Sequence, residues 1–220
     1  MATQVIIYKA FILLILILSI AFHEYGHARV AKWLGDDRAE RDGRVTLNPL
    51  KHISLIFSVL LPGYLIYHGL AIFGAGKPVM VNPERLRRPA FDMMLISVAG
   101  PLVNVLLALM ATAAMHVAVD GLSVDPLSDT GLLLLMAVRI NLLLAVFNLL
   151  PVPPLDGHRV LALFLPRALR EIFYRMWILG LLLLLYLFVG GGSELMYRRL
   201  LLPMGEWYLR LLPDGIGTVF

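Results

Sequence analysis

The stretch "LLILILSIAFHEYGHARVAKWLG", residues 13 to 35, joins a lipid-soluble segment to a cluster of polar side chains without a break. A helix needs roughly 20 predominantly apolar residues to cross the hydrocarbon core of a bilayer. The apolar run from residue 6, continued through residue 32, is long enough, so we expect the first membrane span here. His23, Glu24 and His27 then lie inside that span, toward its polar end.

The composition agrees with a membrane environment. Of the 220 residues, 60% are hydrophobic and 15% are charged, whereas soluble domains carry about 25% charged residues. The net charge of +4 suits basic loops beside anionic lipid. Aromatic and basic residues do not interleave as in RNA-binding proteins, so we expect a lipid bilayer and no nucleic acid as partner. There is no cysteine, which excludes disulfides and thiolate metal sites.

Apolar and polar segments alternate along the rest of the chain and predict an all-α polytopic membrane protein. We expect a helical bundle of about 4–6 membrane segments, with a short β element near the cytoplasmic face. The segments expected after the first are 53–73, 93–119, 132–150 and 176–189, with a shorter apolar stretch that resumes near Val160. The predicted organisation is one membrane domain at 1–192, with its core at about 8–165, and an amphipathic tail at 193–220.

Loop charges predict the topology. Residues 32–52 carry five Lys or Arg and residues 75–91 carry four, whereas the turn at 120–130 carries three Asp and no basic residue. Under the positive-inside rule the basic loops are cytoplasmic, in a multi-pass protein of the cell membrane. This requires residues 53–73 to enter the membrane and return, with a turn at Pro62-Gly63. The alternative is a crossing helix with a proline kink.

His23 and His27 are four residues apart, so on a helix both imidazoles project from one face, offset by roughly 40°. Glu24 points to the side, where a metal-bound water would lie. This is the H-E-x-x-H arrangement of zinc hydrolases, with the glutamate as general base. A charged group at the centre of a membrane helix costs about 2.5–3.5 kcal/mol, which favours a functional role. The alternative is a hydrated helix end at the interface.

Catalytic zinc usually takes three protein ligands and keeps one position open. Without cysteine, the third ligand should be a carboxylate or a histidine from another segment. Asp156, in "FNLLPVPPLDGHRV" (147–160), follows a membrane span and a proline-rich break that could turn it inward. His158 is the rival candidate, and we favour Asp156.

Three motifs carry a resemblance to a known family. "HEYGH" (23–27), "AGPLVN" (99–104) and "NLLPVPPLDG" (148–157), each in or beside a membrane span, look like those of the site-2 protease family of intramembrane zinc metalloproteases. The likeness covers about residues 8–165. The connecting segments resemble those of small bacterial and archaeal members, without a PDZ or CBS domain. Ser54 departs from the family, in which this position is often Asp.

The resemblance implies one zinc ion per chain, with His23, His27 and Asp156 as ligands and Glu24 as the catalytic base. Asn148 matches a residue thought to contact the substrate or the developing oxyanion; alternatively, it caps the broken helix. Asn104, with Gly100-Pro101, matches a packing motif, since small residues let membrane helices approach and an asparagine can bond across them.

The function implied is hydrolysis of peptide bonds in transmembrane protein substrates, as in regulated intramembrane proteolysis, with the active site toward the cytoplasmic side. Residues 77–83, "KPVMVNP", are the candidate edge strand that holds a substrate extended; alternatively they form a plain loop. A second short strand is expected at 44–47. The competing functions are a polytopic transporter or ion-binding protein that uses intramembrane His and Asp as a cation site, and an inactive relative that only binds. Oligomeric state is left open.

Overall fold

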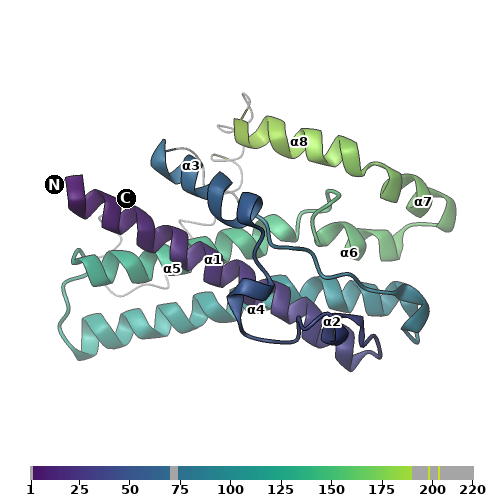
Figure 1. The fold of residues 1–220 in the computed structure, drawn as a ribbon, viewed down its shortest axis with the longest axis horizontal. Helices are drawn as coiled ribbons and strands as arrows, with labels where there is room; N and C mark the ends of the chain where they lie inside the picture. Colours follow the sequence, from purple (N-terminus) through teal and green to yellow (C-terminus); the bar gives the residue numbers. More distant parts are fainter. Residues whose placement is uncertain (1, 70–73, 190–197, 199–202, 204–220) are drawn as a thin grey trace.

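The computed structural model describes residues 2–69, 74–189, 198 and 203, and these are mostly helical. The α-helices are α1 Ala2–Trp33, α2 Arg38–Arg41, α3 Leu61–Tyr67, α4 Pro89–His116, α5 Asp129–Asn148, α6 Gly157–Phe164, α7 Arg167–Arg175 and α8 Trp177–Val189 (Figure 1). Shorter helical turns are η1 Pro49–Lys51, η2 Leu55–Leu60, η3 Pro83–Arg85 and η4 Val117–Gly121. The predicted tail at 193–220 lies outside the described residues except for positions 198 and 203.

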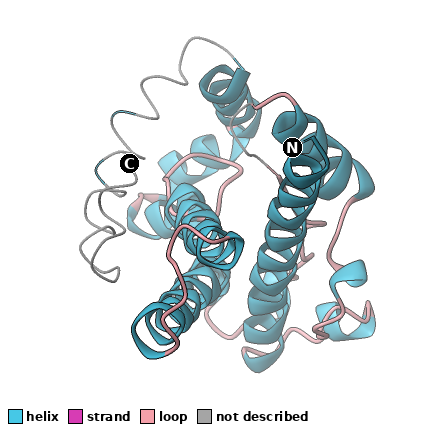
Figure 2. Ribbon diagram, turned by 90° about the vertical axis from the view of Figure 1, so that its left-hand side faces the viewer, coloured by secondary structure: helices cyan, strands magenta, loops and turns pink. Residues whose placement is uncertain are grey.

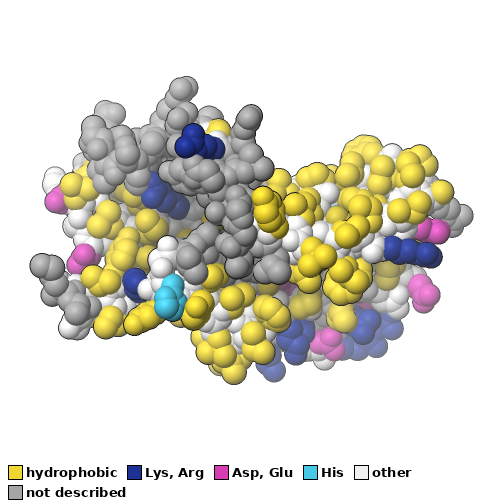
Figure 3. Space-filling model, turned by 90° about the horizontal axis from the view of Figure 1, so that it is seen from above, with side chains coloured by type: hydrophobic (Ala, Val, Ile, Leu, Met, Phe, Trp, Pro, Cys, Tyr) yellow, Lys and Arg dark blue, Asp and Glu magenta, His cyan; other side chains and the backbone are white. Residues whose placement is uncertain are grey.

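Among the described residues, three helices are long and apolar enough to cross a membrane, namely Thr3–Trp33, Pro89–Gly121 and Asp129–Asn148. They coincide with the first, third and fourth segments predicted from the sequence. Hydrophobic side chains cover much of the described surface, and many of the Lys, Arg and carboxylate side chains gather along the right and lower edges of the view (Figure 3). The chain is a membrane protein built on these three helices.

Helix α4 packs along both α1 and α5, and α1 also touches α5 (Figures 1 and 2). The contact between α1 and α4 is close because small residues line it. A Cβ added at Gly26 would lie 2.9 Å from Val103 Cγ2 and 3.0 Å from the Ala99 carbonyl oxygen. Small residues allow this approach between membrane helices. The polar part of α1 therefore rests against the middle of α4.

The segment after η1 leaves the polar end of α1 and comes back to it. Its two ends meet at an antiparallel bridge between Ile53 and Gly76, and the Lys77 amide donates to the His52 carbonyl at 2.7 Å. The far end lies near the start of α1, where Lys9 Nζ donates to the Tyr67 carbonyl at 2.8 Å. The outward limb from 55 to 67 is helical and about 20 Å long, shorter than the ~30 Å hydrocarbon core.

This arrangement bears on the two alternatives for the segment, which stay predictions about the membrane topology. The chain returns to its starting point, as the loop charges require. The turn predicted at Pro62-Gly63 is wrong, because helix continues on both sides of Pro62. Proline is tolerated in the first turn of a helix, and Pro62 occupies such a position in α3.

The described residues form no strand, and the expected β element is reduced to the single Ile53–Gly76 bridge. Side chains, rather than a ladder, hold the segment after Gly76. Arg44 Nη1 donates to the carbonyls of Lys77 and Pro78, at 2.9 and 2.6 Å. At the other end, the buried Asp36 accepts from the Asn82 amide at 2.6 Å. Residues 77–82 are therefore fixed at both ends.

Candidate metal centre

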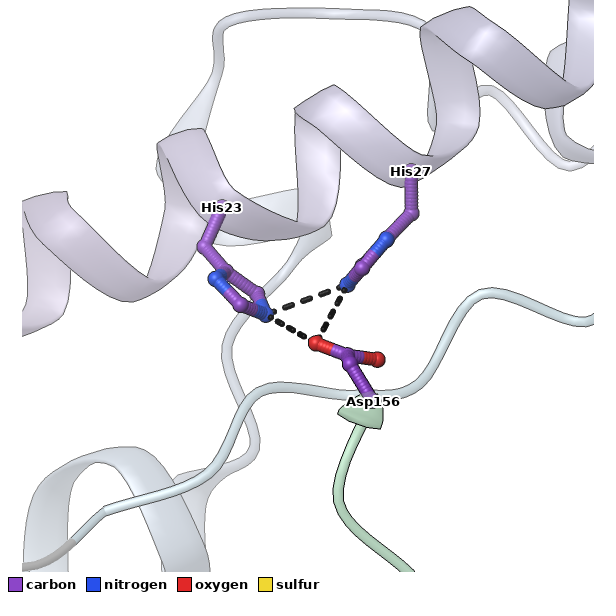
Figure 4. A group of neighbouring side chains, drawn as sticks. All are labelled: His23, His27 and Asp156. Carbon is purple, nitrogen blue, oxygen red and sulfur yellow. Dashed lines mark hydrogen bonds and ion pairs between the residues drawn. The ribbon is translucent and has the colours of Figure 1, made fainter. Parts of the chain in front are cut away.

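Three donor atoms from two distant parts of the chain converge beside α1 (Figure 4). Nε2 of His23 lies 3.1 Å from Asp156 Oδ2, and Nε2 of His27 lies 3.3 Å from the same oxygen. The two Nε2 atoms are 3.0 Å apart. Both histidines are buried, and Asp156 is partly buried. The spacing of the histidines along one helix face, predicted from the sequence, thus brings both rings to one point.

Hydrogen bonds on the opposite ring nitrogens fix the orientation of both imidazoles. His27 Nδ1 donates to the Ile96 carbonyl on α4 at 2.7 Å. His23 Nδ1 lies 2.6 Å from Asn104 Oδ1, also on α4. A neutral imidazole that donates through Nδ1 has a lone pair on Nε2. With both rings neutral, both lone pairs point toward the carboxylate, as the lone pairs of metal ligands do.

Gly100 on α4 makes room for the two rings. A Cβ added there would lie 2.5 Å from both Nε2 and Cε1 of His27, and 2.7 Å from Cε1 of His23. Real Cβ atoms essentially never come this close to a neighbour, so only glycine fits this position. The family motif that contains Gly100 thus forms the wall behind the imidazoles.

The proline-rich break after α5 brings Asp156 to α1. The chain turns tightly, with the Leu155 amide donating to the Val152 carbonyl at 2.8 Å, and α6 begins just after Asp156. A Cβ on Gly157 would collide with the Leu149 carbonyl, so glycine is needed where the chain passes α5. Oδ2 of Asp156 then faces Nε2 of both histidines, at 3.1 and 3.3 Å.

Glu24 is buried next to the donor cluster. It lies against Gly76, at the end of the segment that leaves α1 after η1 and returns to it. A Cβ added at Gly76 would lie 2.6 Å from Glu24 Cγ and 2.7 Å from Oε1. The backbone at Gly76 therefore covers one side of the carboxyl group and limits where it can move.

The remaining candidates are not among the three donors. His158 packs its ring against Tyr174, with centroids 5.7 Å apart, and bonds to the Leu155 carbonyl. Burial lowers the pKa of His158, which keeps it neutral. Asn148, at the last position of α5, donates through Nδ2 to the Leu144 carbonyl at 2.9 Å. Asp156, not His158, joins the two histidines, as favoured from the sequence.

The donor set fits zinc. Zinc binds imidazole nitrogen at about 2.0–2.1 Å and carboxylate oxygen at about 2.0–2.2 Å in tetrahedral geometry, which separates the donors by roughly 3.3 Å. The observed separations of 3.0, 3.1 and 3.3 Å are close to this value. Asp156 Oδ2 is buried and has no hydrogen-bond partner among the described residues, as expected of an atom that faces a cation.

Comparison of the sequence with known proteins identifies the family. The family model described as peptidase family M50 matches residues 126–188, which include Asp156. YwhC of Bacillus subtilis, which carries the name of a zinc metalloprotease, is 35% identical over 196 residues, covering 86% of this chain and 85% of YwhC. The chain belongs to peptidase family M50, the site-2 protease family. Membership makes it a zinc-dependent metalloendopeptidase and decides for the enzyme over the transporter.

More distant M50 relatives are longer than this chain. The Rip2 proteins of Mycolicibacterium smegmatis and Mycobacterium tuberculosis, also named as zinc metalloproteases, are 32% identical. Their matches cover 66% of this chain and 53% of their own length. No solved structure matches the chain.

Two residues near the M50 site were not predicted to act there. Gly76 touches Glu24, and the "GAG" triplet at 74–76 was the signal that could have pointed to a close backbone approach. Asn141 lies in the middle of the apolar segment α5 and bonds to Asn104. A buried polar side chain in a membrane helix is itself the signal for this residue.

Proposed function

We propose that this protein is an intramembrane zinc metalloprotease that hydrolyses peptide bonds of transmembrane-helix substrates. The observation that carries the proposal is the convergence of His23 Nε2, His27 Nε2 and Asp156 Oδ2 within 3.0–3.3 Å of one another, beside a candidate membrane helix. These three residues would hold one zinc ion per chain. When bound, zinc would lower the pKa of its water toward roughly 7 and polarise the scissile carbonyl.

Glu24 acts as the general base. Its carboxylate accepts a proton from the attacking water and later donates that proton to the leaving amine nitrogen of the substrate. Contact with the Gly76 backbone holds the carboxyl group beside the donor cluster, and burial excludes bulk water from this proton transfer.

Asn148 acts on the substrate side of the reaction. One of its two amide hydrogens is used in the bond to the Leu144 carbonyl, which orients the side chain. The second hydrogen is the donor we assign to the substrate carbonyl as negative charge develops on its oxygen. An Asn148→Ala enzyme would then lose turnover while keeping its zinc.

Residues 77–82 receive the unwound substrate. Within the described part of the chain, the backbone groups of Val79, Met80 and Val81 have no backbone hydrogen-bond partner. Both ends of this segment are anchored, so an extended substrate can pair with it at little ordering cost. Edge pairing exposes the substrate's peptide bonds, which its own helical hydrogen bonds otherwise shield.

The proposed topology places the site at the cytoplasmic side of the cell membrane. We count three crossing helices, the returning segment 54–75 and α8 as five membrane segments, within the 4–6 expected from the sequence. The loops at 34–52 and 77–88 meet at one end, where the Asn82 amide donates to Asp36 at 2.6 Å and Arg85 bonds Asp37. These loops carry the positive charge that the positive-inside rule assigns to the cytoplasm.

The test compares wild type, Glu24→Gln and a control, Glu84→Gln, which alters an exposed glutamate. Each is assayed for zinc content and for cleavage of a membrane-spanning peptide in detergent micelles. We expect Glu24→Gln to keep its zinc and to lose about 10²–10⁴-fold in cleavage rate. A Glu24→Gln enzyme that cleaves at the wild-type rate would contradict the proposal.

A further inference from the structure

A hydrogen-bonded chain of amides connects α5 to the donor cluster. Asn141 is 4% exposed, on a helix otherwise rich in leucine. Its Oδ1 accepts from Asn104 Nδ2 at 2.9 Å, and its own Nδ2 donates to the Ala137 carbonyl at 2.8 Å. Asn104 Oδ1, in turn, faces His23 Nδ1 at 2.6 Å.

Backbone carbonyls fix the direction of this chain, because they can only accept. The Ala137 carbonyl requires the amino group of Asn141 on its side, which turns Asn141 Oδ1 toward Asn104. Asn104 then donates both to Asn141 and to the Ser19 carbonyl, the latter at 3.3 Å. Its oxygen is left facing His23, so the ring must donate through Nδ1.

We propose that Asn141 is a positioning residue for the metal ligand His23. By holding the Asn104 amide in one orientation, it keeps the His23 proton on Nδ1 and the Nε2 lone pair toward the metal. This inference rests on the proposed zinc site. Without Asn141, the Asn104 amino group has only the long bond to Ser19, and the amide can rotate so that a donor faces the His23 ring.

Groups that orient a metal-bound imidazole typically contribute 10–100-fold to metal affinity. We therefore expect Asn141→Leu, which keeps the number and branching of the side-chain heavy atoms but removes both hydrogen bonds, to weaken zinc binding by that factor. Zinc affinity is measured by competition with a chromogenic chelator on the purified full chain in detergent. The matched control is Val138→Ala, an equally buried change on the same helix with no link to the chain of amides. It should leave zinc affinity unchanged.

A double-mutant cycle separates positioning from general destabilisation. If Asn141 acts through Asn104, the change Asn141→Leu has little further effect on zinc affinity once Asn104→Leu is present. Equal effects of Asn141→Leu in both backgrounds would overturn the proposal. So would wild-type zinc affinity in Asn141→Leu.

A spectroscopic readout covers the case in which Asn141→Leu does not fold. In zinc-free, histidine-labelled protein, nitrogen and carbon chemical shifts report which ring nitrogen of His23 carries the proton. We expect the Nδ1–H form in wild type and a mixture in Asn141→Ala; an unchanged tautomer in Asn141→Ala would refute the inference. If wild type binds no zinc at all, the proposed function fails instead, so the two failures are distinct.

Discussion

Gly100→Ala tests the wall behind the two imidazoles. A glycine-to-alanine change inside a helix normally stabilises it by about 0.5–1 kcal/mol. Here the added methyl group would lie 2.5 Å from His27 Nε2 and 2.7 Å from His23 Cε1. We expect the opposite of the usual result, with damage confined to the metal centre.

The size of the effect follows from the contact distances. Non-bonded heavy atoms settle at about 3.5 Å, so the His27 ring must move by roughly 1 Å to admit the methyl group. Metal–ligand distances tolerate only about ±0.2 Å. A shift several times larger breaks the shared geometry of the two nitrogens with Asp156. We expect zinc affinity to fall by about 100-fold or more, comparable to or beyond the loss of an orienting partner.

Chelator competition on purified protein measures this loss. Gly63→Ala, in helix α3, is the control, because among the described residues its methyl group would meet only Leu13 Cδ2, at an ordinary 3.8 Å. We expect this control to bind zinc as wild type does. Wild-type zinc affinity in Gly100→Ala would show that the rings do not occupy the space in front of Gly100, and would refute the reasoning.

Three further predictions concern the surroundings of the site. Gly76→Ala should lower cleavage about 10–100-fold with zinc retained, since its Cβ would lie 2.7 Å from Glu24 Oε1; a wild-type cleavage rate would count against the contact. Arg44→Met frees the Lys77 and Pro78 carbonyls and should raise KM for a peptide substrate more than it lowers kcat; a fall in kcat alone would contradict substrate binding at this segment. Removing the metal with a chelator should abolish cleavage and lower the thermal midpoint, both restored by added zinc; cleavage that survives complete zinc removal would rule out a metal-dependent step.

The sequence predicted the candidate metal ligands better than it predicted the residues that position them. His23 and His27 share a helix face by spacing alone, and this needs no knowledge of tertiary structure. Asp156 could be predicted because it ends a proline-rich break at the edge of a membrane span. The contact with Asn141 could not, because it depends on how α4 and α5 are rotated against each other. Nothing in the spacing of Asn104 and Asn141 specifies that rotation.

The irregular segments were predicted least well, for a physical reason. Residues 77–83 have the β-branched and proline-bounded composition of an edge strand, but no described strand pairs with them. The ends of this segment are held by Arg44 and Asp36, two side chains distant in sequence whose contacts leave no periodic signal. Pro62-Gly63 was predicted to turn the chain, yet proline also suits the first turn of a helix. The structure uses it in that second way.

Anomalous diffraction at the zinc absorption edge, from crystals of the wild-type protein, tests the central claim most directly. We expect one strong peak per chain, about 2.0–2.2 Å from Nε2 of His23, Nε2 of His27 and a carboxylate oxygen of Asp156. The peak should be lost or weakened in Asp156→Ala. A zinc peak held by other residues, or a peak of undiminished height in Asp156→Ala, would contradict the account.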